Sequence, residues 1–105
     1  MKALLRTTTA EDKMSEIMIR RHISFTGRVQ GVGFRYRARR AASLYGCTGW
    51  VRNEWDGSVT MEIQGKTEDI NRVIQAIRAG RYVEIETMDG KEIPLEDERG
   101  FRTEY

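Results

Sequence analysis

The strongest constraint on the fold comes from two segments whose apolar residues recur at helical spacing, each lying between segments that alternate with a period of two. The first spans residues 34–45, with apolar positions at Phe34, Ala38, Ala41, Ala42 and Tyr45. The second has Ile70, Val73, Ile74 and Ile77. Such stripes predict amphipathic helices that each bury one face. A chain of 105 residues has room for one core, so both helices must pack on the same sheet.

The residues between these stripes predict the helix ends and the strands. Gly46 is placed to end the first helix, and the second is predicted over 68–79, with Thr67 as its cap and Gly80 after it. Strands are predicted at Ile19–Thr26, Trp50–Asn53, Val59–Gln64 and Tyr82–Met88, with a short one at Phe101–Tyr105.

The predicted order is therefore β-α-β-β-α-β, followed by a short C-terminal strand. Asp-Gly pairs at 56–57 and 89–90 predict turns beside two of the strands. Each strand has one strongly apolar face, so both helices are expected on one face of a mainly antiparallel sheet. This is the ferredoxin-like α/β sandwich, an α+β fold. The fold hosts many functions and decides nothing about activity.

Composition places the chain among soluble globular proteins, with 39% hydrophobic and 32% charged residues. It has no apolar run of about 18 residues, so no membrane span is expected, and residues 1–22 lack the apolar stretch of a secretory signal. Residues 1–17 are polar and aperiodic, and we expect a flexible appendage there, with the folded domain at 18–105. We expect a cytoplasmic protein that does not bind membranes.

The single cysteine and the single histidine limit the possible chemistry. Cys47 excludes an internal disulfide and fits a reducing compartment. With only His22 beside it, a zinc site is not expected, and neither is any other metal or cofactor. We expect Cys47 to be a small packing residue rather than a nucleophile, and His22 to lie at the surface. Nothing in the sequence requires a second subunit, so we expect a monomer.

Positive charge gathers in one segment of a nearly neutral chain. The net charge is +2, but Arg35, Arg37, Arg39 and Arg40 fall within six residues. A local basic patch of this kind favours a small anion over a long polyanion. The alternative is a solvated helix face with a secondary role in steering anions.

The segment 27–35, Gly-Arg-Val-Gln-Gly-Val-Gly-Phe-Arg, joins the first strand to the first helix. Its glycines permit positive φ, and successive N–H groups in a tight loop make an anion-binding nest, to which the helix start adds its own unpaired N–H groups. Arg35 in the first helical turn is unfavourable unless an anion is bound there. The alternative is a glycine loop required only for a tight turn. The segment is not a P-loop, because no Gly-Lys-Ser/Thr follows, and it is not a Gly-x-Gly-x-x-Gly motif, because Tyr36 occupies the last glycine position.

Together with a second block at 49–57, Gly-Trp-Val-Arg-Asn-Glu-Trp-Asp-Gly, this segment resembles the two signature blocks of the acylphosphatase family. The resemblance covers Ile19–Tyr105. It implies the ferredoxin-like fold and hydrolysis of small-molecule acyl phosphates to a carboxylate and inorganic phosphate, without a metal. Inorganic phosphate is then expected as product and inhibitor.

The resemblance also implies roles for individual residues. Arg35 and Asn53 are the expected catalytic residues: Arg35 binds the phosphate and Asn53 positions the attacking water. The expected phosphate-binding loop comprises Val29, Gln30, Gly31, Val32, Gly33, Phe34 and Arg35. Trp55 either flanks the acyl group or is simply exposed. A neutral amide suits the role of Asn53, because it both donates and accepts hydrogen bonds while a carboxylate would repel the phosphate.

Two positions depart from the family pattern. The family ending Phe-x-Ile-x-Tyr has Thr103 at its third position, and Gly80 is followed by Arg81 where proline is frequent. These two changes concern packing and stability more than chemistry.

Two other functions stay open beside hydrolysis: a binding module for RNA or a phosphoprotein, and a regulatory small-molecule domain. The low net charge and the lack of an aromatic-rich RNA-binding strand argue against nucleic acid.

Overall fold

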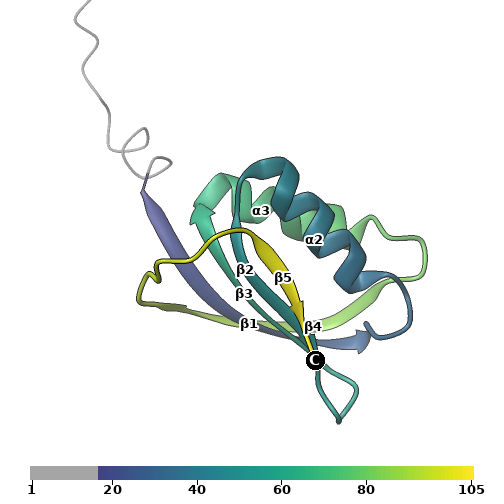
Figure 1. Ribbon diagram of the computed structural model, residues 1–105. Coiled ribbons are helices and arrows are strands. Elements are labelled where there is room, and N and C mark those ends of the chain that lie inside the picture. Colours follow the sequence, from purple (N-terminus) through teal and green to yellow (C-terminus); the bar gives the residue numbers. More distant parts are fainter. Residues whose placement is uncertain (1–16) are drawn as a thin grey trace, which may run out of the picture.

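The computed structural model describes residues 17–105, so the predicted appendage at 1–17 lies outside the described residues except for Ile17. Seven elements follow in chain order (Figure 1). They are β1 (Met18–Arg28), α2 (Phe34–Tyr45), β2 (Thr48–Asn53), β3 (Val59–Lys66), α3 (Thr67–Arg78), β4 (Glu84–Ile93) and β5 (Phe101–Glu104). The predicted element order, including the short final strand, is confirmed.

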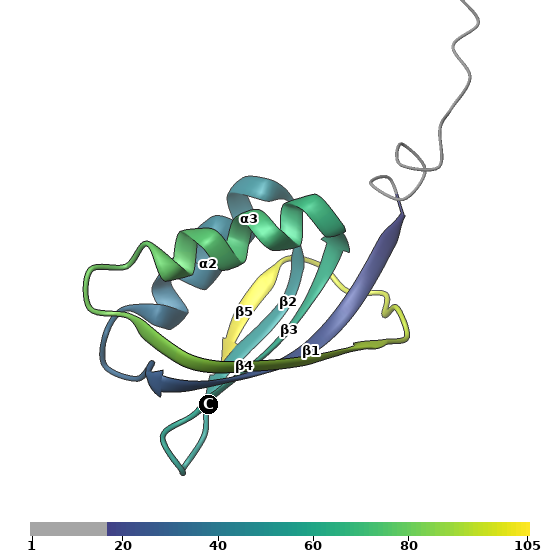
Figure 2. The same ribbon diagram turned by 180° about the vertical axis from the view of Figure 1, so that it is seen from behind.

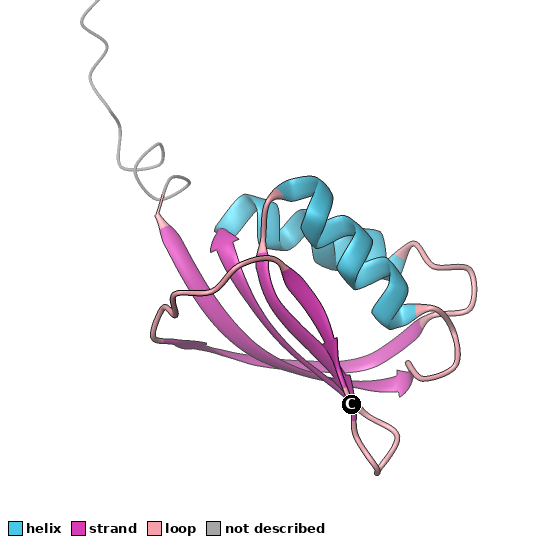
Figure 3. Ribbon diagram, in the orientation of Figure 1, coloured by secondary structure: helices cyan, strands magenta, loops and turns pink. Residues whose placement is uncertain are grey.

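The five strands form one sheet in the order β4-β1-β3-β2-β5. Neighbouring strands are antiparallel except for β2 and β5, which are parallel. Both helices cover the same face of this sheet, as Figure 3 shows by element type and Figure 2 shows from behind. The predicted ferredoxin-like sandwich is therefore confirmed. Neither helix is long and apolar enough to cross a membrane.

The core lies between the helices and the sheet, and the predicted apolar stripes supply it. Fully buried side chains include Ile23, Phe25, Val51, Val59, Met61, Ile63, Val73 and Ile77. Phe25 of β1 meets Phe34 of α2 edge to face, with ring centroids 4.9 Å apart, a geometry that aromatic pairs prefer. Cys47 is buried, and its burial, with the nearby Asp69 charge, raises the pKa of its thiol to about 11. The thiol is therefore neutral at physiological pH and packs as a small apolar group.

Two sequence predictions about local structure are wrong. Thr67 does not cap α3 from outside but is its first helical residue; Lys66 is the cap position and makes no side-chain cap hydrogen bond. Asp89 and Gly90 form no turn, because β4 continues through them in register with Ser24 and Ile23 of β1.

Glycine is needed at position 90 because neighbouring side chains pass close to its Cα, and not because the chain bends there. A Cβ built on it would lie 2.8 Å from a guanidinium nitrogen of Arg21 and 3.3 Å from a side-chain carbon of Ile23. Pairing along a whole strand therefore outweighs the local turn preference of Asp-Gly. A two-residue sequence signal carries no information about this long-range pairing.

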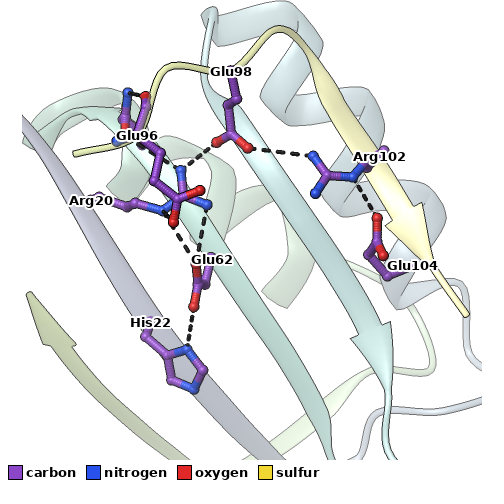
Figure 4. Close-up of polar contacts among 8 residues, drawn as sticks. Arg20, His22, Glu62, Glu96, Glu98, Arg102 and Glu104 are labelled. Carbon is purple, nitrogen blue, oxygen red and sulfur yellow. Dashed lines mark hydrogen bonds and ion pairs between the residues drawn. The ribbon is translucent and has the colours of Figure 1, made fainter. Parts of the chain in front are cut away.

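The polar face of β1 holds an arginine that is fully buried. Arg20 donates to Glu62 at 3.1–3.2 Å and to Glu98, and it lies 3.4 Å from Glu96 (Figure 4). The other Glu62 oxygen lies 2.7 Å from Nδ1 of His22. Burial alone would lower the pKa of Arg20, but the hydrogen bonds to Glu98 and Glu62 outweigh it, so the pKa is raised. We call these five residues the Arg20 cluster.

The cluster holds the connection between β4 and β5 against the face of the sheet that the helices leave open. Gln64 of β3 exchanges two hydrogen bonds of 2.9 Å with the backbone of Glu96. Glu98 also accepts from Arg102 of β5, which pairs in turn with Glu104 (Figure 4). The chain thus passes from β4, at one edge of the sheet, to β5 at the other, guided by charged side chains.

Candidate active site

A small pocket of about 180 Å³ opens where β1 leads into α2. It is lined by Val29, Gly31, Gly33, Phe34, Arg35, Tyr36 and Asn53. The loop before α2, the β2–β3 hairpin and the C-terminus all lie at this end of the molecule (Figures 1 and 2). Sites for drug-sized ligands usually measure about 300–1,000 Å³, so this pocket suits a smaller group.

The loop takes its shape from alternating anchors and glycines. Val29 and Phe34 are buried in the core, with 1% and 2% of their surface exposed. Between them Gly31 has φ 74° and Gly33 has φ 84°. Nothing lies within 4 Å of a Cβ built on either glycine, so the glycines are required by the backbone conformation rather than by lack of space.

The loop leaves a set of backbone donors without partners. Among residues 17–105, the N–H groups of residues 30–33 form no hydrogen bond. Gly33 is the N-cap residue of helix α2, so no side chain forms a capping hydrogen bond there, and the first turn contains no acidic residue. The first backbone bond of the helix runs from Arg37 N–H to Gly33 O at 3.0 Å. Unpaired N–H groups in a tight loop and at a helix start together form an anion-binding concavity.

Arg35 brings a positive charge to the same pocket without a protein counter-ion. Its side chain is half-buried, and within the described residues no carboxylate lies at ion-pair distance from it. Its guanidinium carbon lies 5.5 Å from the ring centroid of Tyr105, a cation–π distance. The guanidinium is therefore oriented by an aromatic face while its N–H groups stay available to an anion.

Asn53 supplies a polar group from the other side of the pocket. It is the last residue of β2, and its Oδ1 atom is buried with no hydrogen-bond partner in the described part of the chain. A buried acceptor without a donor costs about 1–3 kcal/mol. An orphan acceptor at a pocket wall therefore points to a partner that arrives with a ligand.

The structure brings most of the predicted site residues together. Six of them line the pocket: Val29, Gly31, Gly33, Phe34, Arg35 and Asn53. Two loop residues turn their side chains away, because Gln30 bonds to the β2–β3 hairpin and Val32 packs against the core. Their backbone N–H groups remain among the unpaired donors.

Sequence reasoning missed two tyrosines at the site. Tyr36 lines the pocket, and Tyr105 stacks on Arg35. Tyr36 directly follows Arg35 in the sequence, so its position could have been noticed. No local signal connects Tyr105 to Arg35, seventy residues earlier in the chain; only the parallel pairing of β5 with β2 brings it there.

The other candidates lie away from the pocket. Trp55 is 97% exposed at the tip of the hairpin and does not line the pocket. This favours the prediction that Trp55 is simply exposed over the prediction that it flanks the acyl group. Arg37 donates to the carbonyl of Ala76, and Arg39 and Arg40 are exposed. A larger hollow of about 910 Å³ lies beside α2 and shares only Tyr36 with the pocket. No group of three or more histidine, cysteine or carboxylate side chains among the described residues could hold a metal ion.

Known proteins match this chain over nearly all of the described residues. The family model for acylphosphatase matches residues 21–103. An acylphosphatase of Clostridium acetobutylicum is 43% identical over 91 residues, which cover 85% of this chain and 100% of that relative. The crystal structure of an acylphosphatase from Bacillus subtilis has a TM-score of 0.77 at 30% identity, covering 83% of this chain and 99% of that chain. The structure of an acylphosphatase from Coxiella burnetii has a TM-score of 0.75 at 30% identity, covering 83% and 93%.

These matches decide between the functions that the sequence left open. They extend over both loops that form the pocket, and they favour an enzyme over a binding module or a regulatory domain. The chain belongs to the acylphosphatase family, hydrolases that cleave acyl phosphates to a carboxylate and inorganic phosphate without a metal ion.

Proposed function

We propose that this acylphosphatase binds the phosphate of its substrate in the loop at residues 29–35 together with Arg35, and that Asn53 positions the attacking water. The observation that carries the proposal is one pocket of about 180 Å³ whose walls hold three unsatisfied groups. The first group is the set of unpaired N–H groups of the loop, and the second is the Arg35 guanidinium, which has no carboxylate at ion-pair distance among the described residues. The third is the Oδ1 atom of Asn53, which has no hydrogen-bond partner among those residues. An acyl phosphate with a water molecule satisfies all three at once.

The phosphate would occupy the concavity of the loop. The N–H groups of the loop donate to its oxygens, and Arg35 donates to two of them in a forked arrangement. These donors already surround the site, so little reorganisation is needed as charge develops on the transferred group. The carboxyl oxygen that will leave points out of the loop.

Asn53 would hold the water opposite the leaving group. Its Oδ1 accepts a hydrogen bond from the water, which turns the water's lone pair toward phosphorus. The water oxygen bonds to phosphorus while the bond from phosphorus to the acyl oxygen breaks. The electron pair of that bond leaves with the carboxylate, and the proton of the water passes to the released phosphate or to solvent. The carboxylate is a good leaving group, so positioning and charge stabilisation suffice without a general acid.

Hydrolysis of benzoyl phosphate in the presence of a chelator tests the proposal. We expect rapid turnover by the wild-type protein, and losses of about 10²–10³-fold in kcat/KM for Arg35→Ala and for Asn53→Ala. Arg39→Ala is the matched control, since Arg39 lies one helical turn further along α2, exposed and outside the pocket. Near-wild-type turnover by a folded Arg35 or Asn53 variant would remove that residue from the mechanism.

Inorganic phosphate would act as product and as competitive inhibitor, because it presents the same oxygens to the loop. We further propose that the protein is a cytoplasmic monomer. The single buried cysteine supports the reducing location. Light scattering at two protein concentrations and fractionation of cells that express the protein test these two points. A mass of twice 12.2 kDa in solution, or recovery outside the cytoplasm, would contradict them.

A further inference from the structure

The side chain of Gln30 joins the phosphate loop to the hairpin between β2 and β3. Its amide nitrogen Nε2 donates to the carbonyl oxygen of Glu54 at 2.7 Å and to that of Ser58 at 2.8 Å. A primary amide carries two N–H hydrogens, so each carbonyl can take one of them. The contact therefore has a defined direction as well as a defined length.

The two acceptors are the residues that close the hairpin turn. The N–H of Glu54 donates to Ser58 O at 2.9 Å, and the N–H of Gly57 donates to Glu54 O at 3.2 Å. A carbonyl oxygen has two lone pairs, so each can accept from the turn and from Gln30 together. Glu54 directly follows Asn53, so Gln30 holds the backbone immediately beyond the residue that is proposed to position the water.

Few other loop side chains are available for this purpose. Gly31 and Gly33 have none, Val29 and Phe34 are buried in the core, and Arg35 stacks on Tyr105. In the described part of the chain, Gln30 is the only residue of the 29–35 loop whose side chain forms a hydrogen bond. The loop follows β1 and the hairpin joins β2 to β3; β1 pairs with β3 as far as Phe25 and Val59. Gln30 links the loop to the hairpin turn beyond these last paired residues.

We infer that Gln30 is a positioning residue that sets the separation between the phosphate loop and Asn53. The inference rests on the proposed function, because Gln30 acts through Asn53. Its backbone N–H belongs to the donors for phosphate, while its side chain determines where the water stands relative to the phosphorus atom. Loss of the side-chain amide should therefore lower kcat while phosphate still binds.

The chemistry of the contact explains why glutamine stands here. Methionine has a similar volume but no N–H donor, so it removes both hydrogen bonds without opening a large cavity. Ionised glutamate has the same length but only accepts, so it would face two carbonyl oxygens with a negative charge close to the bound phosphate. Protonated glutamic acid regains one O–H donor.

Steady-state hydrolysis of benzoyl phosphate by Gln30→Met provides the first test. The matched control is Gln75→Met, at an exposed glutamine on α3. We expect kcat to fall about 10- to 100-fold, since misplacement of a reacting group by about 1 Å can cost that much. The inhibition constant for inorganic phosphate should stay at the wild-type value, and the control should match wild type in both. An unchanged kcat, or phosphate binding that weakens in proportion to kcat, overturns the inference.

The Asn53→Ala background separates this inference from the proposed function. If Gln30 acts through Asn53, Gln30→Met has no further effect on kcat once Asn53 is removed. Losses that multiply in the double variant would show that Gln30 acts independently and would overturn the inference. Wild-type turnover by Asn53→Ala alone would instead overturn the proposed role of Asn53, and this is seen before Gln30 is changed.

Gln30→Glu gives a second readout that does not depend on the methionine variant being folded. Its kcat relative to wild type should rise as the pH is lowered through the titration of the introduced carboxyl group, because only the protonated form can donate to a hairpin carbonyl. A merely structural role predicts no such rise. A ratio that stays flat from pH 8 down to about pH 4, where a carboxyl group with the ordinary glutamate pKa of about 4.3 is mostly protonated, overturns the inference.

Discussion

Arg20 lies within strand β1 and Arg35 in the first turn of helix α2, and the two arginines differ in where their negative counter-charge comes from. Arg20 is fully buried and meets three carboxylates, those of Glu62, Glu96 and Glu98. Arg35 is half-buried and meets no carboxylate among the described residues, but it borders a pocket with unpaired N–H groups. The same side chain thus stabilises the fold where the chain supplies the anion, and is available to a substrate where the chain supplies none.

The largest effect expected from this comparison is on stability at Arg20. Removing one partner of a buried ion pair costs about 3–5 kcal/mol, because it leaves charges buried without compensation. We therefore expect Arg20→Met to lower the free energy of unfolding in urea by about this amount. Turnover of benzoyl phosphate per folded molecule should remain at the wild-type value.

The matched control is Arg99→Met, because Arg99 is exposed in the same β4–β5 connection and has no ion pair among the described residues. Its unfolding free energy should stay within about 0.5 kcal/mol of wild type. Equal stability of the Arg20 and Arg99 variants would contradict a structural role for the cluster.

The opposite pattern is expected at Arg35. Arg35→Met should lower kcat/KM by about 10²–10³-fold, a loss of about 2.7–4 kcal/mol of transition-state stabilisation. The free energy of unfolding should fall little, because removing the Arg35 side chain leaves no carboxylate of the described residues without its partner. Urea unfolding and turnover are measured for both variants. Arg20→Met should lose stability but keep its turnover, and Arg35→Met should lose turnover but keep most of its stability. A large loss of stability in Arg35→Met with little loss of turnover would remove the distinction.

Acid should weaken the Arg20 cluster without a mutation. Burial would raise the pKa of Glu62, but the hydrogen bonds from His22 and Arg20 outweigh it, so the pKa is held below its ordinary value of 4.5. A carboxylate with a depressed pKa stabilises the fold fully above its unfolded pKa and loses this contribution as the pH falls through the folded pKa.

We therefore expect the urea midpoint of the wild type to fall as the pH drops below about 4.5. Arg20→Met should show a shallower dependence on pH, because its Glu62 lacks one of the two groups that depress the pKa. Urea titrations at half-unit pH steps measure both slopes. Identical slopes would mean that Arg20 does not hold Glu62 in its charged form.

The smallest effect expected is protection by inorganic phosphate. Phosphate at a concentration equal to its Kd adds about 0.4 kcal/mol to the stability of a protein that binds it only when folded. For a domain of this size that raises Tm by about 2–3 °C. The rise should persist in Arg20→Met and be lost in Arg35→Met. Equal protection of both variants would place phosphate elsewhere on the molecule.

Local sequence patterns predict the elements better than they predict the contacts between distant residues. The two helical stripes and the alternating strands are set by nearby residues, and both were confirmed. The Asp89-Gly90 turn failed because β4 stays paired with β1 through those residues. A turn preference of two residues cannot compete with a strand that is hydrogen-bonded along its length.

The same limit explains which parts of the site were predictable. The glycine loop and Asn53 lie in blocks whose local sequence is distinctive, and the structure places both at one pocket. The side-chain role of Gln30 depends on carbonyls 24 and 28 residues further along the chain. The burial of Arg20 on a polar strand face depends on a glutamate 78 residues away. Neither partner is indicated by spacing or periodicity.

This separation of 78 residues between Arg20 and Glu98 also bears on the order in which the chain folds during synthesis. Strand β1 leaves the ribosome well before the carboxylates of Glu96 and Glu98, which follow β4 in the chain. Until then Arg20 has only Glu62 as a counter-ion from within the cluster. Contacts of such long range form late, because the intervening chain must close first. The surroundings of Arg20 are therefore completed only after β1 has paired with β3 and β4, and those of Arg35 only once β5 and Tyr105 are in place.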